Sequence, residues 1–435
     1  MATLYDRDMH QSRNFNGQLH VASSNASKQS LKLFKAMKPI LIFGQIFGLL
    51  PVSLNNDVEK IQFKFKSFKT FYSFLLQFFC ISEFVALAYF LYADDNFDFN
   101  VLGNLIFYFI GIFTTFYFIF FANKWKSLIV LWDKYDDVFS CPLYSHSHET
   151  IVFGRKVKFI SAFFFGFLII DNFFRMSSEI YIGYLKFERC SNDDDADFSP
   201  IAKEIYIQQR SILFRLIDFN YFYIPIFEFV HISRRVHWCF VELFIIILGM
   251  NLSLKFNQFY ERLNKVRQQI VWDGYWRMSR EHYVMLCELS EKASEFSSPL
   301  LTLITFADFF FLCERLYKQY AADYDTFGRI QISLLGTFFL LRSIILFYYC
   351  STVNFHASRP LEILRDAPLR NINVDFQRLV NEVENCDRGF SGAGFFIIKK
   401  SFIISFIGAV TTYQLVILQN INTIRRAINS TVIDC

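Results

Sequence analysis

A line of small and polar side chains runs along the last apolar stretch of the sequence, residues 397–420. Its members follow one another at spacings of 3 or 4 residues, and they are Ser401, Ser405, Gly408, Thr412, Leu415 and Gln419. These spacings place all of them on one face of an α-helix. On a helix otherwise built from Phe, Ile, Val and Leu, such a face meets water or another helix rather than lipid.

Two structures fit this face, a close contact between helices and the lining of a pore. Gly and Ser let helices approach closely, and Ser or Thr hydroxyls can bond to their own backbone, so packing explains most of the line. Gln419 favours the pore, because a primary amide is larger than packing needs and can line a wet constriction.

Ionisable residues inside other apolar stretches are candidates for a ligand site. A charge at the centre of a bilayer costs about 2.5 to 3.5 kcal/mol, so each such group is either functional or paired. The residues in question are Glu83, Asp171, Arg175, Asp308, Glu314, Arg315 and Arg342. Asp171 and Arg175 stand four residues apart, the spacing at which two side chains of one helix can pair.

The elements that must hold these residues are membrane-spanning helices. The chain is 53% hydrophobic and contains 58 Phe, and a span needs about 20 mostly apolar residues. Seven stretches meet this need, at residues 68–92, 101–122, 157–178, 232–254, 297–318, 330–353 and 397–420. A shorter stretch, 39–54, is interrupted by Gly44, Gly48 and Pro51, which predicts an interfacial or re-entrant segment.

The charged region 255–296 has a helical period, which predicts that the fifth span extends beyond the membrane. Its apolar face comprises Tyr283, Leu286, Leu289, Ala293 and Phe296. Such a face usually packs against a neighbouring helix, so we expect a contact within the protein or between its subunits rather than with a separate partner.

The distribution of Lys and Arg predicts the orientation in the membrane. These residues are concentrated before the first span and in every second loop, and basic residues remain in the cytoplasm. The sequence therefore predicts a cytoplasmic N-terminal segment (1–66), a seven-helix membrane channel domain (67–420, pore helix 397–420) and an extracellular tail (421–435). This is the reverse of a G-protein-coupled receptor. Asn429 begins a sequon in that tail, a candidate for glycosylation as well as an unused site close to the membrane.

Several other functions are not expected. The sequence has no P-loop, no GxSxG elbow and no HExxH pair, so we expect no enzyme activity and no cofactor. The nine Cys and eight His show no metal-site spacing. The net charge of +4 is explained by basic loops, so we expect no nucleic-acid partner.

The two ends of the chain resemble insect gustatory receptors. Thr412 and Tyr413, five further residues and Gln419 are similar to the C-terminal signature of that family, Thr-Tyr, five mainly apolar residues and Gln-Phe. Residues 389–396 with Lys399 and Lys400 resemble the entry to its last helix, and residues 39–52 resemble its sugar-receptor clade. Two positions depart from the pattern: Asn420 replaces Phe, and Gln414 replaces the Glu usual in sugar receptors.

The resemblance implies an arrangement for the whole receptor. It implies a homo- or heterotetramer, with other gustatory receptor subunits in the second case, in which the seventh helix of each subunit surrounds a central pore. It places Gln419 and Asn420 at the gate. It also implies a ligand pocket in the outer half of each subunit's helical bundle.

A sugar pocket needs planar polar groups for hydroxyls and aromatic faces for the ring. The outer halves of the spans supply the following candidates: Glu83, Tyr89, Asn104, Tyr108, Asp171, His231 and Gln331. For each one alone, an interhelical hydrogen bond or a place in the aromatic belt of the membrane is the commoner role.

The sequence is therefore interpreted as an all-α, multi-pass protein of the plasma membrane. The function that follows from the resemblance is a ligand-gated, non-selective cation channel opened by sugars. Alternatives are a channel of odorant-receptor type, a receptor for other tastants, and, from another class, a secondary transporter. A transporter would normally show inverted repeats and paired broken helices, which the sequence does not.

Overall fold

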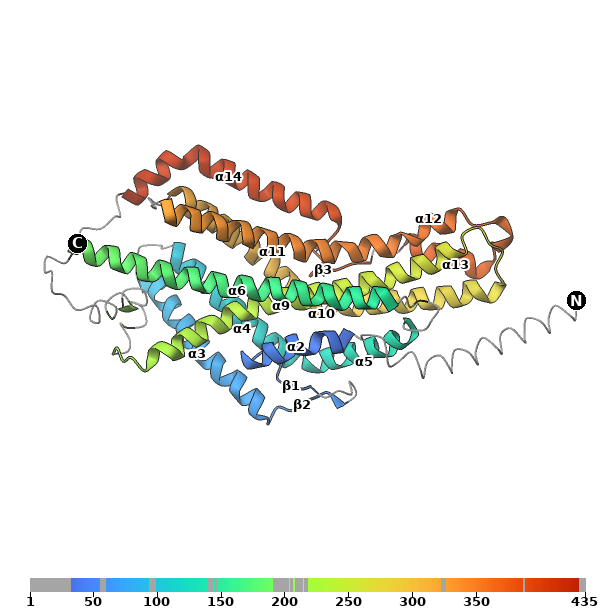
Figure 1. Cartoon of the computed structure of the whole chain (residues 1–435), viewed down its shortest axis with the longest axis horizontal. Helices are drawn as coiled ribbons and strands as arrows, with labels where there is room; N and C mark the ends of the chain where they lie inside the picture. Colours follow the sequence, from blue (N-terminus) through green and yellow to red (C-terminus); the bar gives the residue numbers. More distant parts are fainter. Residues whose placement is uncertain are drawn as a thin grey trace, which may run out of the picture.

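Long helices make up most of the protein (Figure 1). The computed structural model describes residues 33–54, 60–93, 99–139, 144, 147–190, 218–321, 326–385 and 388–429, with 203, 206, 207 and 214. The first half contains α2 (Leu33–Ile46), β1 (Val52–Ser53), β2 (Gln62–Phe63), α3 (Phe68–Ala93), α4 (Phe99–Phe120), α5 (Ala122–Phe139) and α6 (Ser147–Cys190). The second half contains α9 (Tyr223–Lys265), α10 (Asp273–Ala321), α11 (Thr326–Ser358), α12 (Pro360–Arg365), the 3-10 helix η2 (Leu369–Asn371), α13 (Val374–Glu384), β3 (Ser391–Gly392), β4 (Phe396–Ile397) and α14 (Lys400–Asn429).

The prediction of seven spans is confirmed. Within the described part of the chain, seven helices are long and apolar enough to cross a membrane: α3, α4, α6, α9, α10, α11 and α14. The chain is thus an all-α, multi-pass membrane protein. The four strands form only two short antiparallel hairpins, β1 with β2 and β3 with β4.

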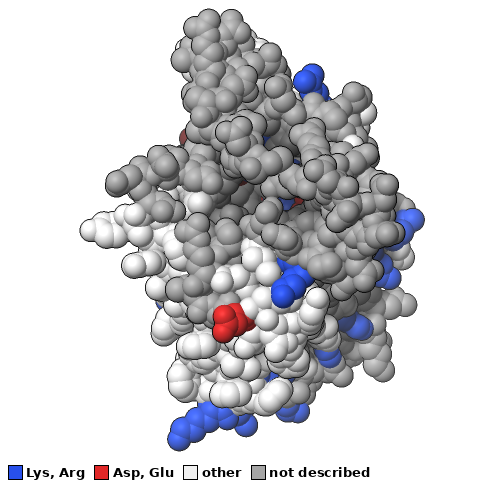
Figure 2. Space-filling model, turned by 90° about the vertical axis from the view of Figure 1, so that its left-hand side faces the viewer, with Lys and Arg blue, Asp and Glu red and all other residues white. Residues whose placement is uncertain are grey.

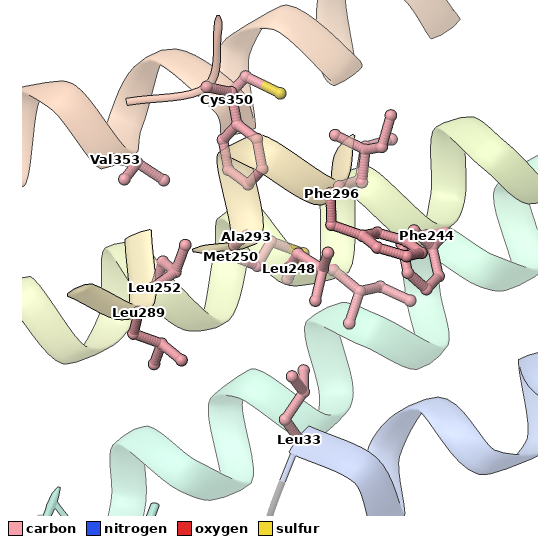
Figure 3. Close-up of a cluster of buried hydrophobic side chains, with 14 of the residues drawn as sticks. Leu33, Phe244, Leu248, Met250, Leu252, Leu289, Ala293, Phe296, Cys350 and Val353 are labelled. Atoms are coloured by element: carbon pink, nitrogen blue, oxygen red, sulfur yellow. The ribbon is translucent and has the colours of Figure 1, made fainter. Parts of the chain in front are cut away.

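Helix α9 is the centre of the bundle, because α2, α4, α6, α10 and α11 all pack against it. Its middle is buried on every side, as expected for a helix that is apolar all round. Gly249 allows a close approach to the backbone of α11, since a Cβ at this position would lie 3.0 Å from the carbonyl oxygen of Tyr349. Figure 3 shows Phe244, Leu248 and Leu252 of this helix among residues of α2, α10 and α11.

The helical extension before the fifth span is confirmed for residues 273–296, where α10 is one continuous helix. Its predicted apolar face is buried within the chain, and Tyr283 Oη donates to the carbonyl oxygen of Ala357 at 3.0 Å. Residues 255–265 differ from the prediction, because they continue α9 instead. Both parts have a helical period, and only the break at 266–272 assigns them to different helices.

Helix α5 was not predicted. It is amphipathic, and its apolar face is narrow: Trp125 and Trp132 are fully buried, while its Lys side chains keep the overall composition polar. Trp132 Nε1 donates to Asn251 Oδ1 of α9 at 2.8 Å. This hydrogen bond gives a buried polar group of the central helix a partner.

The segment predicted to be interfacial or re-entrant begins as the short helix α2. Gly44 touches the ring of Phe240 on α9, so closely that an added Cβ would lie 2.6 Å from it. From the last turn of α2, Gln45 Nε2 donates to the carbonyl oxygens of Leu50 and Val52, which holds the chain in a turn toward β1. Where this segment lies relative to the membrane stays a prediction.

Candidate functional site

A cavity of about 450 Å³ opens at one end of the bundle. We call it the five-helix cavity, because α4, α6, α9, α10 and α11 supply its walls. Its aromatic residues are Phe107, Phe167, Trp238, Phe311 and Phe339, and its ionisable residues are Asp171, Arg175, His231, Arg235, Glu314, Arg315, Lys318 and Arg342. The wall is completed by Gly103, Asn104, Leu168, Gln331, Ile332 and Leu335. Apolar walls with a few convergent polar groups are typical of small-ligand sites.

Figure 2 looks onto this end of the molecule, the left-hand end of Figure 1. Among the described atoms of this face most belong to residues without charge, with an acidic and a basic patch near its centre and further basic side chains toward its margins.

Asp171 is the predicted ligand residue with the most polar partners in the five-helix cavity. Its Oδ2 accepts a hydrogen bond from Arg235 Nη1 at 2.7 Å, and its Oδ1 lies 3.7 Å from Arg315 Nη2. The expected pairing of Asp171 with Arg175 is wrong, because Arg175 pairs with Glu228 of α9 at 2.6 Å. Asp171 and Arg175 each pair with a residue of a neighbouring helix, and these ion pairs form in place of the i, i+4 contact within α6.

Three more predicted ligand residues line the same cavity. Gln331 Nε2 donates to the carbonyl oxygen of Phe174 at 3.0 Å, which ties α11 to α6. His231 Nδ1 lies 3.0 Å from Arg234 Nη2. Asn104 lies on α4 with its side chain exposed.

The other predicted ligand residues do not line the five-helix cavity. Glu83 and Tyr108 are buried and hydrogen-bonded to each other, and the guanidinium of Arg234 lies 3.4 Å from the centre of the Tyr108 ring. Arg234 Nη1 is also 3.4 Å from Glu83 Oε2. Tyr89 is 61% exposed on α3, which fits a position in the aromatic belt.

A fully buried ionic cluster lies behind the cavity wall. Arg342 Nε is 2.7 Å from Glu242 Oε2, and its guanidinium lies 4.6 Å from the centre of the Phe339 ring. Trp238 Nε1 donates to Asp308 Oδ1 at 3.2 Å. Glu242 and Asp308 have no exposed surface, so the single guanidinium of Arg342 neutralises charge that water cannot reach.

Sequence reasoning missed Arg235, Trp238, Lys318 and Glu242. Each lies in or beside a predicted span, so the cost of a polar group in the membrane was the available signal. Arg235 follows Arg234 directly, and two adjacent arginines at the start of an apolar run indicate costly polar groups that need partners.

The predicted pore face of α14 lies opposite the face with which this helix packs. Phe406, Val410 and Ile417 are buried, and the Phe406 ring centre lies 4.9 Å from that of Phe347 on α11. At about 100° per residue, the line from Ser401 to Gln419 is roughly half a turn away. All its members are exposed in the single chain, as is Asn420.

The side chains along that line make local hydrogen bonds. Ser405 Oγ donates to the carbonyl oxygen of Ser401 at 3.2 Å, and Thr412 Oγ1 to that of Gly408 at 2.9 Å. These bonds satisfy the hydroxyl donors without a partner helix. Figure 1 shows α14 along one side of the bundle, beside α11.

A second cavity, of about 260 Å³, lies between α14, α10 and α11. Ile407, Val410, Thr411 and Gln414 form its α14 side. Arg315 and Ile332 line this cavity and the five-helix cavity alike. These two side chains therefore form a common wall between the five-helix cavity, which is the candidate ligand site, and the cavity beside α14, which is the candidate pore helix.

The fold is that of insect chemosensory receptors. The olfactory receptor OR5 from Machilis hrabei superposes with a TM-score of 0.64 at 15% identity, covering 88% of this chain and 97% of that one. A structure of the same receptor in complex with eugenol gives a TM-score of 0.59 at 18% identity, with 89% and 98% covered.

The sequence defines the family within this class. The family described as "Trehalose receptor" matches residues 15–428, so the chain belongs to this family of insect gustatory receptors. The gustatory receptor for sugar taste 64b of Drosophila melanogaster is 24% identical, with 89% of this chain and 95% of the relative covered. The Drosophila gustatory receptor 5a for trehalose is 23% identical, with 88% and 84% covered. The resemblance inferred from both chain ends is thereby confirmed, and the protein is a receptor rather than an enzyme.

Proposed function

We propose that this protein is a ligand-gated, non-selective cation channel of the plasma membrane that sugars open. The observation that carries the proposal is the face of α14 from Ser401 to Gln419, which is polar, exposed and turned away from the rest of the subunit. An exposed polar face on an otherwise apolar helix needs water or other subunits beside it. A homo- or heterotetramer with these faces around a central pore provides both.

The five-helix cavity is the proposed sugar site. Asp171, Asn104, Gln331 and His231 offer hydrogen-bonding groups, and Trp238 offers an aromatic face near them. Glu83 and Tyr108 act on the site indirectly in this proposal, because Arg234 connects them to His231. Tyr89 lies outside the cavity lining.

Arg315 and Ile332 provide the proposed link between ligand and pore. A sugar that engages the Asp171 carboxylate competes with Arg315 for it, and Arg315 also lines the cavity beside α14. The sugar opens the channel only to the extent that it binds the open arrangement more tightly than the closed one. At the proposed gate, Asn420 Nδ2 donates to the carbonyl oxygen of Val416 at 2.9 Å.

Replacing Asp171 with asparagine tests the sugar site. A hydrogen bond to a charged group contributes about 1.5 to 3 kcal/mol, so we expect the half-maximal sugar concentration to rise at least about tenfold, with surface expression within about twofold of wild type. The measurement is a dose–response curve in transfected cells together with surface labelling.

Glu228→Gln is the matched control. Glu228 is also a half-buried carboxylate paired with arginine, yet it does not line the five-helix cavity. We expect its dose–response curve to move by less than about threefold. Equal shifts in the two variants, or loss of expression with unchanged sensitivity for Asp171→Asn, would mean that Asp171 is only structural.

The proposed orientation has its own test. An epitope tag added after residue 435 should be labelled by antibody on intact cells, and a tag before residue 1 should be labelled only after permeabilisation, because basic residues hold the N-terminal side in the cytoplasm. The opposite staining would disprove both the extracellular tail and the candidate glycan at Asn429.

A further inference from the structure

A cavity of about 420 Å³ lies at the opposite end of the bundle from the five-helix cavity. We call it the Lys156 cavity. Its walls are α6 near Lys156, α9 from Met250 to Asn257, and α11 from Tyr348 to His356. Lys156 and Asp171 lie on the same helix, fifteen residues or about 22 Å apart. The two cavities are therefore separate sites near opposite faces of the membrane.

The lining of the Lys156 cavity suits an anion. Lys156 and His356 face it, and Ser253, Asn257, Tyr349 and Thr352 add hydroxyl and amide groups. None of its lining residues, all of which lie in the described part of the chain, is a carboxylate. This differs from the five-helix cavity, where Asp171 and Glu314 neutralise part of the basic charge.

One buried polar atom of this cavity lacks a protein partner among the described residues. Nδ1 of His356 is buried and makes no hydrogen bond to any described residue. A buried polar atom in this state usually has a ligand or water as its partner. Further basic charge lies close by, because Lys400 Nζ is 3.3 Å from the ring centre of Phe355, the neighbour of His356.

Exposed large side chains surround the same place. Ile151 precedes the α6 wall and is 59% exposed, and Tyr348 and Phe355 on α11 are exposed as well. In a bilayer these apolar surfaces contact acyl chains. A molecule that fits the whole surface therefore places an anionic phosphate group in the cavity and lays hydrocarbon chains over the exposed apolar side chains around it.

We propose that the Lys156 cavity binds the headgroup of an anionic glycerophospholipid. Lys156 and the hydrogen-bond donors of α9 and α11 would hold the phosphate, and the acyl chains would lie over Ile151 and Phe355. The predicted orientation places this end toward the cytoplasm, whose leaflet carries the anionic lipids. Basic pockets between spanning helices on that side bind such headgroups. The proposal does not depend on sugar gating.

Native mass spectrometry of the purified full-length protein tests this site. Phosphatidylserine and phosphatidylcholine with identical acyl chains are titrated separately, and we expect phosphatidylserine to bind at least about fivefold more tightly. Lys156→Ala should weaken phosphatidylserine binding about fivefold, the effect of one basic residue at an anionic membrane surface. His356→Ala should weaken it at least about twofold, because it removes a hydrogen-bonding group. Lys156→Arg should stay within about twofold of wild type, which guards against a folding defect.

Lys158→Ala is the matched control, because Lys158 is an exposed lysine of the same helix outside the cavity lining. We expect it to change phosphatidylserine binding less than about twofold. Equal binding of the two lipids, or an equal effect of Lys158→Ala, would overturn the proposal. A third titration uses inorganic phosphate: phosphate binding that depends on Lys156 and needs no lipid would assign the site to a soluble anion and overturn the lipid assignment.

Discussion

Replacing Arg342 with alanine is expected to remove most of the folded receptor from the cell surface. The change leaves Glu242 and Asp308, which have no exposed surface, without their guanidinium. Removing one partner of a buried ion pair costs about 3 to 5 kcal/mol. Because a folded protein has only about 5 to 15 kcal/mol of stability in total, this loss is large. Surface biotinylation and size-exclusion chromatography of a fluorescent fusion measure it.

Two further variants separate this explanation from a general sensitivity to arginine removal. Arg267→Ala breaks the exposed ion pair with Asp366. This change should leave expression unchanged, because water screens an exposed pair and it contributes little to stability. Adding Glu242→Gln and Asp308→Asn to Arg342→Ala should recover part of the lost expression, because it removes the uncompensated charges. Normal expression of Arg342→Ala alone would contradict the account of the cluster.

Attaching a charged, water-soluble thiol reagent to Ser405→Cys or Thr412→Cys is expected to reduce the sugar-evoked current by more than about 80%. Both positions lie on the exposed polar face of α14, where a bulky adduct would narrow a pore and a fixed positive charge would repel cations. Cys80, Cys239, Cys287, Cys313 and Cys350 are buried, and the receptor without an added cysteine, treated with the same reagent, measures any reaction at its other cysteines. The measurement is whole-cell current before and after the reagent.

Other positions of α14 are the controls for this experiment. Val410 is buried on the packing face, so Val410→Cys should not react. Ile404 and Val416 are exposed but lie off the polar line, and their cysteine variants should react far more slowly. Equal reactivity around the helix, or modification of Ser405→Cys without loss of current, would mean that the line is a packing seam.

The sequence was sufficient for features that a single segment determines. Apolar length alone located the seven spans, and the period of α10 located the buried face from Tyr283 to Phe296. Helix α5 was missed because it is not a membrane-spanning helix. Its burial depends on the packing of Trp125 and Trp132 against α9 and α10.

The candidate site was predictable in its residue types but not in its pairings. Asp171, His231 and Gln331 stood out because polar groups are costly in a membrane, and all three reach one cavity. The partner of Asp171 is Arg235, 64 residues away, and nothing in the local spacing specifies it. Glu83 and Tyr108 stood out for the same reason, yet the bundle satisfies them with each other and with Arg234.

Recording single-channel currents from the purified full-length protein in a planar bilayer tests the central proposal most directly. Sugars are added one at a time to the side that the C-terminal tail faces. We expect discrete current steps that appear with an active sugar, reverse at the potential of a channel that does not distinguish Na⁺ from K⁺, and disappear when Thr412→Cys is modified. Sugar-dependent flux at a carrier's turnover rate without unitary steps, or steps that Thr412→Cys modification leaves intact, would contradict a sugar-gated pore lined by α14.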